Sequence, residues 1–128
     1  MFNKTWKWAG QFRKSEKNIG VAWKKIPEML KALCDDVQYQ IKHTTFSHDE
    51  IAIRFHHRLV FIHPFPNGNG RHARLSADLL IILLSDKRFT WGMNQDLTQE
   101  CSVRKEYIHA LKLADKGDYA KLITFARS

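Results

Sequence analysis

The chain has 128 residues, which is the length of one domain with a single hydrophobic core. Hydrophobic residues make up 44% and charged residues 27%, which excludes a disordered chain, and 6 glycines and 3 prolines exclude collagen-like and linker-like classes. The formal net charge is +8, and residues 1–31 hold eight basic but only two acidic side chains. This basic segment can meet nucleic acid, phosphates or an acidic protein, or it can be a solvated face.

The sequence indicates neither a secretory signal nor a membrane span. Its longest apolar run, Leu79–Leu84, has six residues, whereas a span needs about 20. Cys34 and Cys101 form no CxxC pair, so we expect two small, mostly buried side chains in a reducing compartment. These features predict a cytoplasmic protein without a membrane partner.

The first half of the chain predicts a polar segment followed by two helices. Residues 14–25 are polar around the turn signal Asn18-Ile19-Gly20, which indicates an exposed loop or a short hairpin. A helical period runs from Ile26 to Ile41, with Pro27 suited to its first turn. A second helix opens with the capping box of residues 47–50 and must end near His63, because a proline follows.

The second half predicts three more helices. One starts near Gly70 and runs through Leu83, and because residues 79–84 are apolar on all sides we expect it to be the central, buried helix. A loop follows over residues 86–92, and then a fourth helix from Val103 to Ala114, ended by Gly117. Asp118 caps a short fifth helix that reaches Phe125. The predicted fold class is all-α, with at most one hairpin.

Residues 63–74, HPFPNGNGRHAR, carry the chemistry of the chain. Gly68 and Gly70 allow positive φ angles and leave main-chain N–H groups uncovered, and the loop leads into a helix N-terminus, which suits a phosphate. Arg71 and Arg74 share one helical face beside that point, and each can bind phosphate oxygens through two N–H groups. His63 stands before the loop, where an imidazole can take a proton from a hydroxyl. Together these groups favour phosphoryl or nucleotidyl transfer.

Several of these residues also allow a structural role or a different kind of site. The two Asn-Gly pairs of residues 67–70 are hairpin signals, but their flanks are helical, and the two arginines can also be surface residues. His56, His57 and His63 suggest a metal, yet no carboxylate or cysteine joins them at ligand spacing. The tryptophans at positions 6 and 8 can stack on bases, although we expect them to pack.

The segment closely resembles the Fic motif, His-Pro-Phe-x-Asp/Glu-Gly-Asn-Gly-Arg-x-x-Arg, and matches eight of its nine specified positions. Residues 6–13, WKWAGQFR, resemble the opening of the family, and Arg104, Tyr107 and residues 110–118 resemble its closing helices. The chain looks most similar to the mobile mystery protein B branch of bacterial Fic/Doc proteins. The resemblance implies a single Fic domain over residues 1–128, a helical bundle around a central helix with a short β-hairpin flap at about 14–25.

The resemblance also implies an activity and a role for each matching residue. Fic proteins are mostly adenylyltransferases (AMPylators) that move AMP from ATP, with Mg²⁺, to a hydroxyl of a target protein. By this analogy His63 is the base, and Gly68, Asn69 and Gly70 hold the α- and β-phosphates. Arg71 binds the outer phosphates and Arg74 the γ-phosphate. The flap aligns the protein substrate by strand pairing.

The sequence departs from the family pattern in two ways. Asn67 replaces the Asp or Glu that holds Mg²⁺, and its amide oxygen can coordinate the metal only without charge. The inhibitory pattern Ser/Thr-x-x-x-Glu-Gly/Asn has its nearest match at residues 102–106, inside a predicted helix. We therefore expect an inhibitory helix upstream of this chain or on a separate antitoxin.

Three functions remain open. The first is an AMP transferase, which can be a toxin-like bacterial protein. The second is a Doc-type phosphotransferase, whose motif typically has lysine at the position of Gly70. The third is a catalytically weak Fic-fold binding module, favoured by Asn67 and the basic N-terminal segment. We expect that the protein does not bind nucleic acid.

Overall fold

The computed structural model describes residue 12 and residues 21–84, 86–93 and 100–128. All regular elements in these ranges are helical, which confirms the predicted class. They are a 3-10 helix η2 (Trp23–Lys25) and the helices α1 (Ile26–His43), α2 (His48–Ile62), α3 (Asn69–Leu83), α4 (Glu100–Asp115) and α5 (Ala120–Ala126).

The helix ends follow the predicted local signals. Pro27 lies in the first turn of α1, and the Ser47 hydroxyl accepts a hydrogen bond from the Glu50 main-chain N–H, 3.2 Å away, at the start of α2. The helix α2 ends at His63, before the proline. The N-cap position of α5 is Tyr119 and not the predicted Asp118, but the Asp118 carboxylate accepts from the main-chain N–H of Ala120, the first residue of α5, at 3.2 Å.

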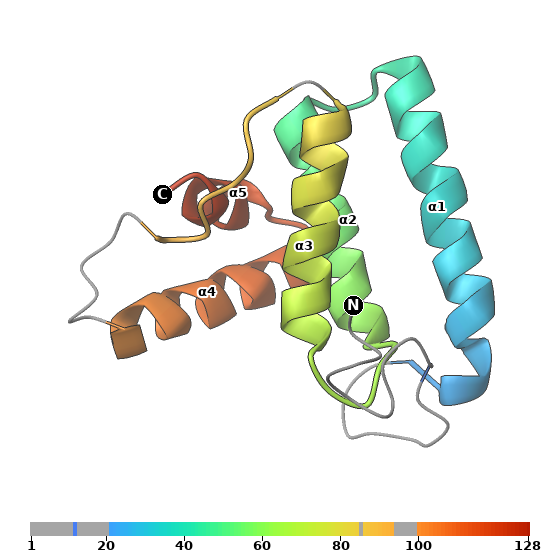
Figure 1. Ribbon diagram of the computed structural model, residues 1–128, viewed down its shortest axis with the longest axis horizontal. Coiled ribbons are helices and arrows are strands. Elements are labelled where there is room, and N and C mark those ends of the chain that lie inside the picture. The colour runs from blue at the N-terminus through green and yellow to red at the C-terminus, as the bar shows by residue number, and fades with distance from the viewer. Residues whose placement is uncertain (1–11, 13–20, 85, 94–99) are drawn as a thin grey trace.

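The helix α2 lies at the centre of the molecule, and Figure 1 shows α2 and α3 side by side between α1 and the α4–α5 pair. One hydrophobic cluster joins α1, α2 and α3 and contains Leu33, Ile62 and Ala73. A second cluster joins α2 and α3 to α4 and α5 and contains Ile53 and Ala77. Because α2 contributes to both clusters, the rest of the fold is built around it.

The prediction that α3 is the central, buried helix is wrong. Its buried residues include the small Ala73 and Ala77, which let α3 approach α2 closely. Its opposite face is exposed: Leu79 is 55%, Ile82 51% and Leu83 80% accessible. An apolar run that covers every side of a helix cannot indicate which side is buried, and the packing of α2 decides it.

Three smaller expectations also meet the structure. Cys34 is exposed on α1, so its predicted burial is wrong, while the side chain of Cys101 lies outside the described residues. Residues 23–25 of the predicted flap form a 3-10 helix and not a strand, and residues 14–20 lie outside the described residues. Among the described helices, none is both long and apolar enough to cross a membrane.

The segment of residues 86–93 is fastened to the C-terminal helix. The main-chain N–H groups of Thr90 and Trp91 donate to the Ala126 carbonyl at 2.8 and 2.9 Å, and the Thr90 hydroxyl donates to the Ser128 carbonyl at 2.6 Å. Arg127 binds Asp49 at the start of α2 and donates to the Lys87 carbonyl. These bonds hold the Trp91 ring against the core.

His56 of α2 is fully buried in this core. Its ring lies 4.7 Å from the Trp91 ring, and its Nε2 is 2.9 Å from the Tyr107 hydroxyl of α4. Burial lowers the pKa of His56 to about 3, with smaller effects from the Ala73 carbonyl, which raises it, and from the Arg74 and His57 charges, which lower it. The folded chain therefore keeps this imidazole neutral at neutral pH.

The low pKa of His56 predicts that acid destabilises the fold. Below pH 6.5 the unfolded chain binds a proton at this position that the folded chain does not, so stability is complete above that pH and is lost as the pH falls towards 3. We expect the free energy of unfolding to drop by about 2 kcal/mol between pH 7 and pH 5 from this residue alone. Urea unfolding at each pH measures it.

The control compares how steeply the free energy of unfolding changes with pH in each variant, and not the free energies themselves. His56→Gln should flatten the dependence, whereas His109→Gln, at an exposed position of α4, should keep it because the burial of His56 is unchanged. An equal slope in the His56→Gln variant and the unmodified chain would contradict the assignment.

Candidate active site

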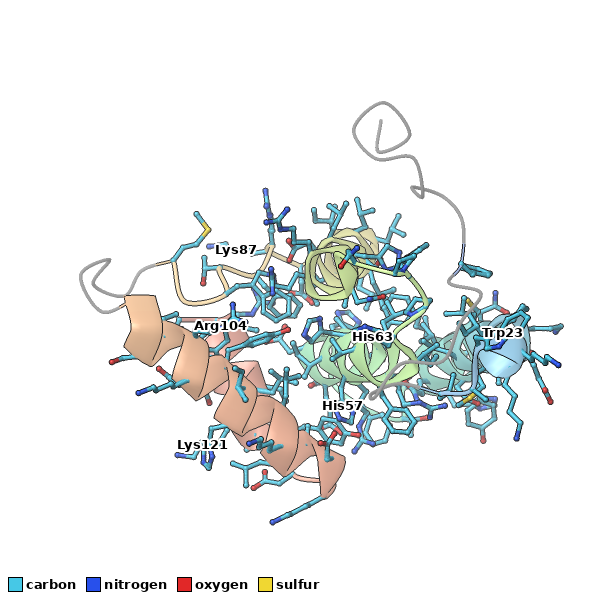
Figure 2. The ribbon with its side chains drawn as sticks, turned by 90° about the horizontal axis from the view of Figure 1, so that it is seen from below. Trp23, His57, His63, Lys87, Arg104 and Lys121 are labelled. Atoms are coloured by element: carbon cyan, nitrogen blue, oxygen red, sulfur yellow. The ribbon has the colours of Figure 1, made fainter. Side chains whose placement is uncertain are left out.

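The motif segment is the connection between α2 and α3. His63 ends α2, residues 64–68 form the loop, and Asn69 begins α3. Figure 2 views the molecule from this end and shows His63 where the chain leaves α2. Because the two helices pack side by side, the loop returns the chain within a few residues, and the predicted base lies beside the start of α3.

The backbone of His63 is in an unusual conformation. Its φ is 53° and its ψ 59°, in the left-handed region, while its N–H still donates to the Leu59 carbonyl at 3.1 Å. This region costs a residue with a side chain on the order of 1–3 kcal/mol, and such strain gathers at functional sites. The half-buried His63 side chain is thus placed at the end of α2, where the chain turns sharply.

The side chain of Asn69 closes the loop. Its Oδ1 accepts from the Phe65 N–H and its Nδ2 donates to the Phe65 carbonyl, both at 2.8 Å, and Asn69 is buried. The Phe65 ring meets His72 edge-on at 4.7 Å between ring centres, with Phe12 at 5.9 Å. The Phe65 ring therefore packs against the first turn of α3.

The N-terminus of α3 is open. Its first helical hydrogen bond runs from the His72 N–H to the Gly68 carbonyl at 3.0 Å, and no side chain caps the helix. The N–H groups of residues 69–71 come before that bond, so they are the donors that a helix leaves for an anion. Gly68 has φ 73°, which confirms the predicted need for glycine there.

Gly70 has a different role from the predicted one. It lies inside the first turn of α3 and its φ angle is not positive. A need for backbone freedom therefore does not explain why this residue is a glycine. A Cβ at this position would stand 3.4 Å from Nη1 of Arg74. The missing side chain gives room for the Arg74 guanidinium over the start of the helix.

The two motif arginines differ in their surroundings. Arg71 is exposed, whereas Arg74 is half-buried with its guanidinium carbon 5.6 Å from the centre of the Tyr107 ring. Asp78, one turn further along α3, has other partners, because its oxygens accept from Trp91 Nε1 at 2.9 Å and Arg88 Nε at 3.2 Å. Residues 63–74 contain no acidic side chain, so the open helix end and both arginines make this region electropositive.

The residues present fit a magnesium ion that arrives with a nucleotide. Mg²⁺ usually keeps several waters and takes phosphate oxygens plus one or two protein ligands. Asn67 is exposed in the loop and offers one neutral amide oxygen. No group of three or more His, Cys, Asp or Glu side chains that could hold a metal occurs in the described part of the chain.

The other histidines of α2 have their own partners. His56 Nε2 faces Tyr107, and His57 Nε2 lies 2.7 Å from the Asp115 carboxylate at the end of α4. Both side chains thus connect α2 to α4. The tryptophans at positions 6 and 8 lie outside the described residues.

Val21, a residue of the segment predicted as the flap, lies next to the site. The Val21 N–H donates to the Ile62 carbonyl at 3.4 Å, next to His63. No local signal in the sequence predicts that Tyr107 and His56 are neighbours of the site. Tyr107 belongs to the pattern that resembles the closing helices of the family, and that pattern does not indicate that α4 crosses beside Arg74.

Comparison with known proteins agrees with this site. Residues 1–81 match the Fic/DOC family. The chain is 31% identical over 120 residues to protein adenylyltransferase fic-1 of Caenorhabditis briggsae and 29% identical over 119 residues to protein adenylyltransferase Fic of Drosophila virilis, each time over 91% of its own length. It covers 22% and 23% of those proteins, about a fifth of their length.

A solved structure gives the same result for the fold. Fic-1 (aa134–508) from C. elegans superposes with a TM-score of 0.71 at 26% identity, over 93% of this chain and 33% of that one. These relatives come from animals, so the predicted bacterial branch stays a prediction. The match over residues 1–81 and the shared fold identify this chain as a member of the Fic/DOC family.

Proposed function

We propose that this chain is the catalytic core of a protein adenylyltransferase that transfers AMP from ATP to a hydroxyl side chain of a target protein. The observation that carries the proposal is the open N-terminus of α3, which stands between His63 at the end of α2 and the half-buried Arg74. The relatives are named as protein adenylyltransferases, which supports the same reaction class.

The proposed reaction uses the residues of the loop as follows. His63 takes the proton of the target hydroxyl while the hydroxyl oxygen attacks the α-phosphorus of ATP. A new phosphorus–oxygen bond forms, the bond from the α-phosphorus to the bridging oxygen breaks, and pyrophosphate leaves with the electron pair. The main-chain N–H groups of residues 69–71 hold phosphate oxygens before and during this step.

The outer phosphates and the metal complete the proposed site. Arg71 and Arg74 bind the β- and γ-phosphate oxygens through charge-assisted hydrogen bonds. A bound Mg²⁺ supplies positive charge to the phosphates, with Asn67 as its protein ligand. The protein substrate docks on the flap. Within this segment the Val21 N–H donates to the Ile62 carbonyl, next to His63.

Gly70 favours AMP transfer over Doc-type phosphate transfer. A lysine there would place a second cation next to Arg74, because its Cβ would stand 3.4 Å from Nη1 of that residue. Incubation of the chain with ATP labelled at the α- or the γ-phosphate, followed by mass spectrometry, separates the reactions. Transfer of α-label with an added mass of AMP supports the proposal, γ-label supports a phosphotransferase, and neither supports a binding module.

Regulation, partners and location remain part of the proposal. We propose an inhibitory helix or a separate antitoxin as the regulator, a toxin-like role and a cytoplasmic location. The basic segment of residues 1–31 serves protein contact in this proposal, and membrane and nucleic acid are not partners.

The role of His63 predicts a variant that binds but does not react. His63→Ala should lower AMP transfer by about 10²–10⁴-fold, because the proton acceptor is lost, while ATP affinity is kept. His43→Ala, at an exposed position of α1, should transfer AMP at the unmodified rate. Near-normal turnover in His63→Ala would remove His63 from the reaction.

The neutral side chain of Asn67 predicts a high magnesium requirement. Asn67→Asp adds a charged oxygen ligand, so the Mg²⁺ concentration that half-saturates both ATP binding and transfer should fall. Calorimetric ATP titrations across a Mg²⁺ series measure the binding part independently of turnover. Asn67→Ala should not lower the requirement, and an unchanged requirement in Asn67→Asp would show that this position does not limit metal binding.

The position of Arg74 predicts a selective loss of ATP affinity. Removing a charged partner of the γ-phosphate costs about 1.5–3 kcal/mol, so Arg74→Ala should weaken ATP binding very roughly 10–150-fold. AMP lacks the outer phosphates and should bind almost as before. Arg58→Ala, which changes an arginine of α2 near α1, is the control and should alter neither affinity. Equal losses for the two nucleotides would contradict the assignment.

A further inference from the structure

The Arg74 side chain belongs to α3 and also contacts α4. Its guanidinium carbon lies 5.6 Å from the centre of the Tyr107 ring of α4, and its Nη1 occupies the space over Gly70. Burial raises the pKa of the Tyr107 hydroxyl, while the charge of Arg74 and a hydrogen bond from it act in the opposite direction. Tyr107 therefore limits the guanidinium on the side away from solvent.

Tyr107 in turn is fixed by the core. Its hydroxyl is 2.9 Å from Nε2 of the fully buried His56, and its ring lies 5.3 Å from the Phe125 ring. His56 is confined by the Trp91 ring and lies near the Ala73 carbonyl, and its buried Nδ1 has no well-formed hydrogen-bond partner in the described part of the chain. The row of polar groups thus starts in the core and ends at the motif arginine.

The chemistry of the three side chains gives this row a direction. Arginine only donates hydrogen bonds, so in a hydrogen bond between the two side chains the Tyr107 oxygen accepts from Arg74. The hydroxyl proton is then available to His56, whose Nε2 is the acceptor. A neutral imidazole with Nε2 free of hydrogen has its proton on Nδ1.

We propose that Tyr107 is a positioning residue that orients Arg74 towards the terminal phosphates of ATP, with His56 as the acceptor that fixes the Tyr107 hydroxyl. The inference rests on the proposed function only in assigning Arg74 to those phosphates. A hydrogen bond to Tyr107 uses one N–H of Arg74, which leaves four of its five donors for phosphate oxygens. An arginine that already points in one direction loses less side-chain freedom when it binds its ligand.

The test separates positioning from simple core packing. Tyr107→Phe keeps the ring against Phe125 and below Arg74 but removes the hydroxyl. We expect ATP affinity to fall roughly 3- to 10-fold, the range of one lost hydrogen bond, with AMP affinity unchanged, in calorimetric titrations of the whole chain. Tyr119→Phe is the matched control, because Tyr119 lies against another arginine, Arg54 at 4.4 Å, and should change neither affinity.

A double variant shows whether Tyr107 acts through Arg74. In the Arg74→Ala background, Tyr107→Phe should cause no further loss of ATP affinity, because the group that it orients is gone. A second approach changes the other end of the row: His56→Leu removes the acceptor and should reproduce the selective ATP loss, whereas His56→Gln keeps an acceptor and should reduce it less. Thermal unfolding of each variant confirms that the compared chains are folded.

Each outcome decides the proposal. A selective ATP loss that disappears in the Arg74→Ala background supports it. An equal loss for ATP and AMP, no loss in Tyr107→Phe, or full additivity with Arg74→Ala overturns it. A chain that shows the selective loss but transfers no AMP keeps this inference and loses the proposed function, whereas a chain that binds neither nucleotide loses both.

Discussion

The structure depends on the sharp reversal of the chain between α2 and α3. Asn69 holds the loop closed through two hydrogen bonds of 2.8 Å to the main chain of Phe65, so its side chain substitutes for backbone pairing that a loop lacks. The closure leaves the N-terminus of α3 uncapped and sets His63 in a left-handed conformation at the end of α2. The proposed base and the proposed anion site thus both depend on this one reversal of the chain.

The packing of α2 against its neighbours fixes that reversal in space. Its residues belong to both hydrophobic clusters, and small side chains such as Ala73 and Ala77 allow α3 to lie close to it. Buried polar side chains add direction to this packing. Asp78 accepts hydrogen bonds from Trp91 and Arg88, and Nε2 of His56 pairs with the Tyr107 hydroxyl, so these polar contacts bring residues 86–93 and α4 to the site.

These buried groups explain how the site is oriented without an acidic partner for Arg74. Asp78, the carboxylate four residues along α3, is occupied elsewhere, and a neutral hydroxyl takes its place beside the guanidinium. A neutral partner orients an arginine without cancelling its charge, so the charge stays available to an anion. An ion pair with Asp78 would have offset much of that charge at short range.

The sequence by itself determined the helices and the motif, because both depend on neighbours along the chain. Helical periodicity, the Ser47 cap and the proline after His63 are local signals, and residues 63–74 carry base, loop and arginines in one stretch. Only the tertiary structure decided which helix is central, since an apolar run on every side of α3 leaves its buried face open. It alone placed Tyr107 beside Arg74, because a contact between residues far apart in sequence depends on how α4 crosses α2 and α3 and not on local preference.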